Sequence, residues 1–288
     1  MRFPIAALLT GAIFFGGIPA YSQPRPANSP VAVAPAVSPF SYADVADLAT
    51  IAPLVVDVRV RSASVLPPER APGIAATTAR IYVEADVIAL IRGTGPLAAR
   101  IAWLVDLPRD ARGKPPKLTK QRLLLFARPV STGQIALVTP DAQLPWDGAT
   151  EALARRVISE VVKPGAPGTV TGIANGFHQA GTLPGEGESQ FFVETRGGEP
   201  LTLSVISAPG RPRQWAATFG EIVDGTAKVP APDTLGWYRL ACGLPRTLAP
   251  GTLVGAPPTE HAAATADYRF ILTQLGECRR TRKPPASR

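Results

Sequence analysis

Residues 120–138 read KQRLLLFARPVSTGQIALV. The run 123–126 (Leu-Leu-Leu-Phe) is apolar at four successive positions, so a strand formed there needs cover on both of its faces. Such a strand lies inside a sheet and not at its edge. A second apolar run, 135–139, follows across a turn at Gly133. We therefore predict a central strand and its neighbour at the end of an N-terminal β-rich region.

Three further strands are expected before this stretch. Each alternates apolar and polar residues, which is the pattern of a strand with one buried face. The expected inward residues are Val56, Val58 and Val60, then Ile81, Val83, Ala85, Val87, Ala89 and Ile91, and in the strand around 99–107 Ile101, Trp103 and Val105. The expected outward residues of the first two strands are Asp57, Arg59 and Arg61, and Arg80, Tyr82, Glu84 and Asp86.

A short helix is predicted in front of these strands. Ser41 begins it, Asp44 stands three residues on as its capping-box partner, and Pro53 ends it. Five short strands with turns between them and one flanking helix are typical of a small, partly open barrel or of a sandwich.

The order of these elements resembles a known family. The helix, the long curved strand pair, the turn LIRGTGPL at 90–97 and the stretch 120–138 are similar to bacterial domains related to the netrin and metalloproteinase-inhibitor modules. The resemblance covers residues 41–140 and implies a five-stranded barrel of the OB type. The animal members depend on several disulfides, and the protease inhibitors chelate the target's metal with an N-terminal Cys. No Cys precedes Cys242 here, so that inhibitory mechanism is not implied.

A second β-rich region is expected after residue 146. A helix beginning at Asp147 or Thr150 leads into it, and two helices close the chain, one from near Asp233 and one from Thr259 to Gly276. The strands expected between them are 170–174, which would end at an Asn175-Gly176 hairpin turn, and a meander of 190–195, 201–206 and 214–219.

The predicted fold class is α+β and mostly β. It consists of an N-terminal five-stranded OB-like barrel (41–146) followed by a second antiparallel β-meander with flanking helices (147–278).

The N-terminus has the form of a secretory signal. Arg2 precedes an almost uniformly apolar run at 3–18, and the small residues Ala20 and Ser22 stand where a signal peptidase requires them. The run is short for a membrane span. We expect residues 1–22 to be a signal peptide, with an uncleaved anchor as the alternative, and the Pro/Ala-rich 23–40 to be a disordered linker. The mature protein is then periplasmic or secreted, without a transmembrane segment, and the whole chain resembles exported bacterial proteins.

The composition indicates a folded body with many loops. Of 288 residues 45% are hydrophobic and 18% charged, while 32 prolines and 26 glycines make up about a fifth. The net charge of +8 is concentrated in two segments, 109–122 and 279–288. We expect a solvated loop and a disordered basic tail, with binding to an anionic envelope polymer as the alternative. Aromatic residues are not interleaved with these charges, which argues against a nucleic-acid partner.

The two cysteines, Cys242 and Cys278, are predicted to form a disulfide. Paired cysteines are expected in an exported chain, and this bond would tie the C-terminus to the body. The alternative is a reactive thiol, which needs a neighbouring base, and no His lies close in sequence to either Cys.

The sequence contains no complete catalytic, metal or cofactor motif. Its two histidines, His178 and His261, are far apart and belong to no paired-ligand pattern, so neither a metal nor a cofactor is expected. Phosphate-loop, dinucleotide and Gly-x-Ser-x-Gly signatures are missing from the sequence.

One stretch, 175–189 (NGFHQAGTLPGEGES), still carries candidate chemistry. As a long Gly-rich connection it would gather His178, Glu186, Glu188 and Ser189, and a His with a nearby carboxylate can serve as an acid–base pair. Glu221 and Asp224 could join such a site. The alternative is that Gly and Pro satisfy turn geometry while the carboxylates face water.

Three functional hypotheses follow from these patterns. The first is a non-enzymatic binding or interaction module at the cell envelope, with an envelope protein or an anionic polymer as its partner. The second is an envelope hydrolase that uses the 175–189 loop. The third is a structural protein that adheres to anionic envelope polymers through its basic segments.

Overall fold

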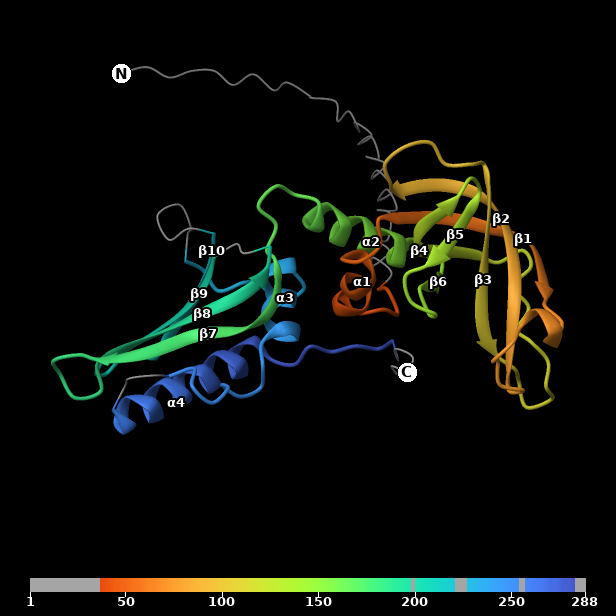
Figure 1. Cartoon of the computed structure of the whole chain (residues 1–288). Helices are drawn as coiled ribbons and strands as arrows, with labels where there is room; N and C mark the ends of the chain where they lie inside the picture. Colours follow the sequence, from red (N-terminus) through yellow and green to blue (C-terminus); the bar gives the residue numbers. More distant parts are fainter. Residues whose placement is uncertain (1–36, 198–199, 221–226, 254–256, 283–288) are drawn as a thin grey trace, which may run out of the picture. The chain divides into compact units, whose positions relative to one another are not determined.

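The computed structural model describes residues 37–197, 200–220, 227–253 and 257–282 (Figure 1). The expected signal peptide (1–22) and most of the expected linker (23–36) lie outside these residues. Residues 36–288 group as one compact unit by their contacts.

The N-terminal half is a closed five-stranded barrel, as predicted. Its strands are β1 (Leu54–Val65), β2 (Thr78–Arg92), β3 (Arg100–Pro108), β4 (Arg122–Ser131) and β5 (Gln134–Leu137). They are ordered β1-β2-β3-β5-β4, and β4 pairs with β1 to close the ring. Neighbours are antiparallel except β3 and β5, which pair in parallel. This is the strand order of an OB-type barrel. Most inward residues are those that the alternation predicts, but a bulge in β2 after Val87 turns Ile91 away from the barrel core, and Asp57, although outward, is fully buried.

β4 is covered on both faces, which confirms its prediction as a central strand. Leu123, Leu125 and Ala127 belong to the barrel core. Leu124 and Phe126 point the other way and belong to a second apolar core. A short strand that was not predicted, β6 (Gln143–Pro145), also pairs with β4.

The second core lies outside the barrel. Its helices and strands are α1 (Tyr42–Ala49), α2 (Gly148–Val161), β7 (Thr169–Ala180), β8 (Gly187–Arg196), β9 (Leu201–Ser207), β10 (Gln214–Phe219), α3 (Leu235–Gly243) and α4 (Pro258–Leu275). The strands form an antiparallel sheet in the order β10-β9-β8-β7, and α4 runs along one face of it (Figure 1). Within the described residues, no helix combines the length and apolar character needed to cross a membrane.

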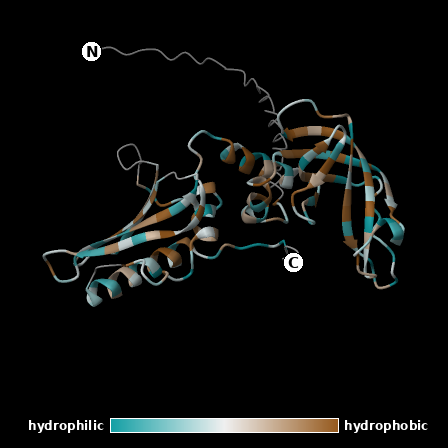
Figure 2. Cartoon of the chain, in the orientation of Figure 1, coloured by the Kyte–Doolittle hydropathy of each residue, from teal (hydrophilic) through white to brown (hydrophobic). Residues whose placement is uncertain are grey.

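The two β-rich regions share this second core. It joins Leu48 of α1 and Phe126 of β4 to Phe191 of β8, Leu240 of α3 and Tyr268 of α4. Strands of both sheets mix hydrophobic with hydrophilic residues (Figure 2), because each sheet buries one face here or in the barrel. The barrel and the meander are therefore packed through common apolar side chains.

The hairpin turn predicted at Asn175-Gly176 is wrong. β7 continues to Ala180, and Asn175 and Gly176 pair with Phe192 and Phe191 of β8. A Cβ on Gly176 would lie 2.7 Å from the Phe191 ring, so the glycine permits close packing where it was expected to permit a turn. The chain turns at 181–186 instead, where Gly185 has a φ of 81°.

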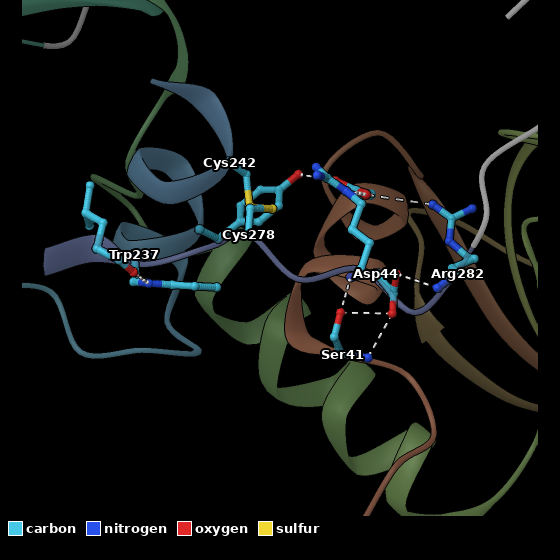
Figure 3. The surroundings of a disulfide bond; sticks show 10 residues. Ser41, Asp44, Trp237, Cys242, Cys278 and Arg282 are labelled. Carbon is cyan, nitrogen blue, oxygen red and sulfur yellow. Dashed lines mark hydrogen bonds and ion pairs between the residues drawn. A yellow bond between two sulfur atoms is a disulfide. The ribbon is translucent and has the colours of Figure 1, made fainter. Parts of the chain in front are cut away.

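The predicted capping box of α1 is present, and the C-terminus completes it. Ser41 Oγ accepts from the backbone N–H of Asp44, whose buried carboxylate accepts from the Ser41 N–H. The same carboxylate accepts from Thr281 N–H and Oγ–H at 3.0 and 2.6 Å and from Arg282 N–H at 3.0 Å (Figure 3). We call residues 277–282 the C-terminal strap.

The basic tail expected at 279–288 is therefore not disordered over 279–282. Arg280 donates to both Asp47 oxygens at 2.6 and 3.0 Å, and Arg282 pairs with Asp141. These carboxylates neutralise the charges that were expected to face water. Residues 283–288 lie outside the described part of the chain.

The other basic segment, expected as a solvated loop, is also anchored at its end. Arg122 donates to the fully buried carboxylate of Asp57, with Nε–Oδ1 at 2.9 Å. The Arg122 guanidinium also stacks on Trp146, 3.4 Å from the ring centroid. The hydrogen bonds to Asp57 raise the pKa of Arg122. Arg109 is half-buried and donates to the Thr78 and Gly113 carbonyls, while the other basic residues of 109–120 are exposed.

The predicted disulfide is present between α3 and the strap. The Cys242 and Cys278 Sγ atoms lie 2.08 Å apart (Figure 3). Close by, Trp237 of α3 donates its indole N–H to the Leu275 carbonyl at 2.9 Å. Both bonds hold the end of α4, and the strap after it, against α3.

Replacement of Asp44 tests the cap. Burial alone would raise the pKa of this carboxylate, but the hydrogen bonds from Thr281, Ser41 and Arg282 outweigh it and lower the pKa below 3.8. The ionised Asp44 carboxylate stabilises the folded state; this stabilisation is complete at pH 7 and is lost as the pH falls below 3.8. Asp44→Asn should lower the free energy of unfolding by about 1.5–3 kcal/mol at pH 7 and by less at pH 3, measured by urea unfolding. The exposed Glu69→Gln is the control, and a pH-independent loss in Asp44→Asn would contradict the assignment.

Loss of the disulfide should destabilise the strap and the fold. We expect Cys278→Ser to lower the free energy of unfolding by about 2–4 kcal/mol, because the open chain gains entropy when unfolded. Dithiothreitol should bring the wild type to the same level and leave the Cys242→Ser/Cys278→Ser protein unchanged. Iodoacetamide labelling of two thiols in denatured, unreduced protein would exclude the bond.

Candidate functional site

The residues proposed from the 175–189 stretch are only partly brought together. His178 on β7 faces Ser189 on β8, with Nδ1 and Oγ 2.9 Å apart. Ser189 donates to Asp267 of α4 at 2.6 Å, and Arg213 Nη1 lies 3.2 Å from the other Asp267 oxygen. Asp267 and Arg213 were missed from the sequence because they lie outside the 175–189 stretch, on α4 and just before β10.

This His178–Ser189–Asp267 cluster is built as a structural network. A nucleophilic hydroxyl needs the imidazole between itself and the carboxylate, and must reach a substrate. Here the Ser189 hydroxyl lies between His178 and Asp267, is fully buried, and donates its hydrogen bond to the Asp267 carboxylate. Because a hydroxyl has one proton, His178 Nδ1 donates to Ser189. The cluster thus ties α4 to the β7–β8 hairpin.

The other candidates point elsewhere. Glu186 closes the hairpin turn, accepting from the N–H groups of Thr182 and Leu183 at 3.1 and 3.2 Å. Glu188 precedes Ser189 on β8 and so occupies the opposite face of the sheet, where Gln190 donates to it at 2.8 Å. Glu221 and Asp224 lie outside the described residues. Among described side chains, no three or more His, Cys, Asp or Glu residues cluster closely enough to hold a metal ion.

A groove of about 960 Å³ lies along β3 of the barrel. One bank is formed by the outer face of β2 and β3, and the other by β5 and the residues after it. Its apolar wall consists of Tyr82, Leu104, Val130, Ala136, Val138 and Pro140.

The groove exists because β5 is short and leaves β3. The β3–β5 ladder consists of one pair, Ala102 with Gln134, and Ala102 N–H donates to the Gly133 carbonyl at 2.8 Å. Beyond it, residues 103–108 have no paired residue on that side among those that the structure describes, so the barrel wall has a gap there. The buried side chains of Trp103, Val105 and Ile135 form the floor of this opening.

Polar groups hold the groove in shape. The indole N–H of Trp103 donates to Gln143 of β6 at 3.1 Å, which sets the orientation of the ring. Arg80 donates twice to Asp106, the residue opposite it on β3, with both distances at 2.8 Å. These hydrogen bonds raise the pKa of Arg80. Arg70 also lines the groove and, among the described residues, forms no ion pair.

Sequence alternation placed the groove residues on the correct faces without revealing the groove. Arg80 and Tyr82 are outward, and Trp103 and Val105 inward, as expected. What alternation does not contain is the point at which β5 ends.

A scan against protein-family models finds no match, and a search of curated proteins finds none either.

Proposed function

We propose that the chain is an exported, non-enzymatic binding module of the cell envelope whose ligand lies in the groove along β3. The observation that carries the proposal is the opening in the barrel wall, with an apolar floor of Trp103, Val105 and Ile135. A mostly apolar hollow of this size with a few fixed polar groups is typical of a ligand site. Leu104 and Val130, 50% and 57% exposed, add large apolar side chains to its rim.

The chemistry of the lining favours binding over turnover. Its charged pair, Arg80 and Asp106, is mutually satisfied by two hydrogen bonds. Neither histidine lines the groove, since His178 is on β7 and His261 on α4. The side chains there can hold and orient a ligand without activating a nucleophile.

Export is supported by the form of residues 1–22 and by the disulfide. Disulfides such as Cys242–Cys278 form and persist in oxidising compartments. We also propose that the barrel is related to the netrin and metalloproteinase-inhibitor modules, which its strand order supports.

N-terminal sequencing of fractionated bacterial cells tests the export proposal. We expect the mature protein in the periplasmic fraction or the medium with Gln23 as its first residue, because Ala20 and Ser22 define the cut. Cytosolic protein that retains Met1 and carries two free thiols would contradict it.

Binding of anilinonaphthalene sulfonate, an apolar fluorescent probe, tests the groove. Leu104→Asp and Val130→Asp should each weaken the Kd at least tenfold, because apolar contact is lost and a carboxylate must be desolvated. Ile206→Asp and Val162→Asp are matched controls, since these side chains are 52% and 56% exposed and lie outside the groove. Equal binding by all four variants, or none by the wild type, would contradict a ligand site here.

A further inference from the structure

The side of β3 that faces the groove is an open strand edge. Peptide groups alternate in direction along a strand, and the Ala102 N–H points toward β5. Those of Leu104 and Asp106, two and four residues on, therefore point the same way. The ladder to β5 ends at Ala102, so within the described part of the chain the N–H and C=O groups of Leu104 and Asp106 have no strand partner on this side.

The opposite bank also presents backbone groups. Val138 N–H donates to Phe126 on β4, so by the same alternation Ala136 faces β4 as well. Leu137 then directs its peptide groups toward the groove and β3. Hydrogen-bond donors and acceptors from two strands thus line a hollow whose side chains are mostly apolar.

We propose that the groove binds an extended peptide, which adds to the open edge of β3 as an extra strand. This inference rests on the proposed binding function and names its ligand class. Backbone hydrogen bonds to Leu104 and Asp106 would supply affinity, as in other cases of strand addition. The open edge runs over 103–108, which matches a segment of about four to six residues.

The geometry also specifies the side chains of the peptide. Successive side chains of a strand point to opposite faces. Every second one therefore enters the barrel opening toward Trp103, Val105 and Ile135, and should be apolar. The intervening side chains lie outside, beside Tyr82 and Leu104, and tolerate polar residues.

The basic residues beside the groove indicate which residues flank the bound peptide strand. Arg70 lines the groove, and the basic loop 109–120 follows directly on the C-terminal end of β3. Within the described part of the chain, Arg70, Arg112, Lys114 and Lys117 form no ion pairs. Acidic residues at that end of the peptide complement these charges. The bank formed by β5 leaves the groove walled on both sides, which suits a single peptide better than the strand of a second barrel.

Panning of a display library of random decapeptides against the purified protein tests the proposal. Enriched sequences should carry apolar residues at every second position and Asp or Glu toward one end. Enriched peptides, made with a fluorescein label, should bind with an affinity measurable by anisotropy and should displace anilinonaphthalene sulfonate.

Backbone methylation of these peptides is the decisive measurement. Alternate peptide N–H groups face β3, so N-methylation at every second position should weaken the Kd at least tenfold. The intervening N–H groups face the shorter β5, so their methylation should weaken the Kd less. In the protein, Leu104→Pro removes the N–H that faces the groove and spares the ladder to β2. It should abolish binding, whereas the matched Leu104→Ala keeps the N–H and should cost threefold or less.

The outcomes separate this inference from the proposed function. Peptides without alternation, or with no two-residue period in the methylation scan, would overturn strand addition. If the apolar probe binds and no peptide does, the groove is a ligand site for small apolar molecules and the peptide proposal fails alone. A dimer in sedimentation that peptides do not dissociate would make a second copy the occupant. Binding of neither probe nor peptide would remove both proposals.

Discussion

Double-sided burial of β4 is the constraint on which the rest of the structure depends. Leu123, Leu125 and Ala127 require a closed barrel on one side, while Leu124 and Phe126 require an apolar cover on the other. The helices and the second sheet supply that cover. The meander is thus packed against the barrel because one strand cannot leave either face in water, at roughly 1.5–3 kcal/mol for each large apolar side chain.

Patterns local in sequence predicted much of this fold. Alternation located the first three strands and most of their inward residues, and the continuous apolar run located β4. The helix start at Ser41, and Asp147 as one of two starts considered for α2, followed from capping side chains. The disulfide followed from cysteine count and compartment. Each of these signals depends on residues close together or on composition, which a single sequence contains.

What the sequence did not reveal depends on distant partners. Gly176 was interpreted as a turn residue, yet its lack of a side chain serves to admit Phe191 on the next strand. Arg280 and Arg282 were expected in water because their carboxylates, Asp47 and Asp141, lie more than a hundred residues away. The groove depends on β5 ending at Leu137 while β3 continues. The His178 cluster likewise needed Asp267, contributed by a helix 78 residues beyond Ser189.

Residues 281 and 282 complete the N-terminal cap of α1, so this helix reaches its full stability only late in folding. A polypeptide emerges from the ribosome N-terminus first, so Asp44 is made long before Thr281, which follows it by 237 residues. Until then the buried carboxylate lacks three of its hydrogen bonds. The cap of α1 is therefore complete only after residue 282 has been made, and a chain cut short before the strap has a less stable first helix.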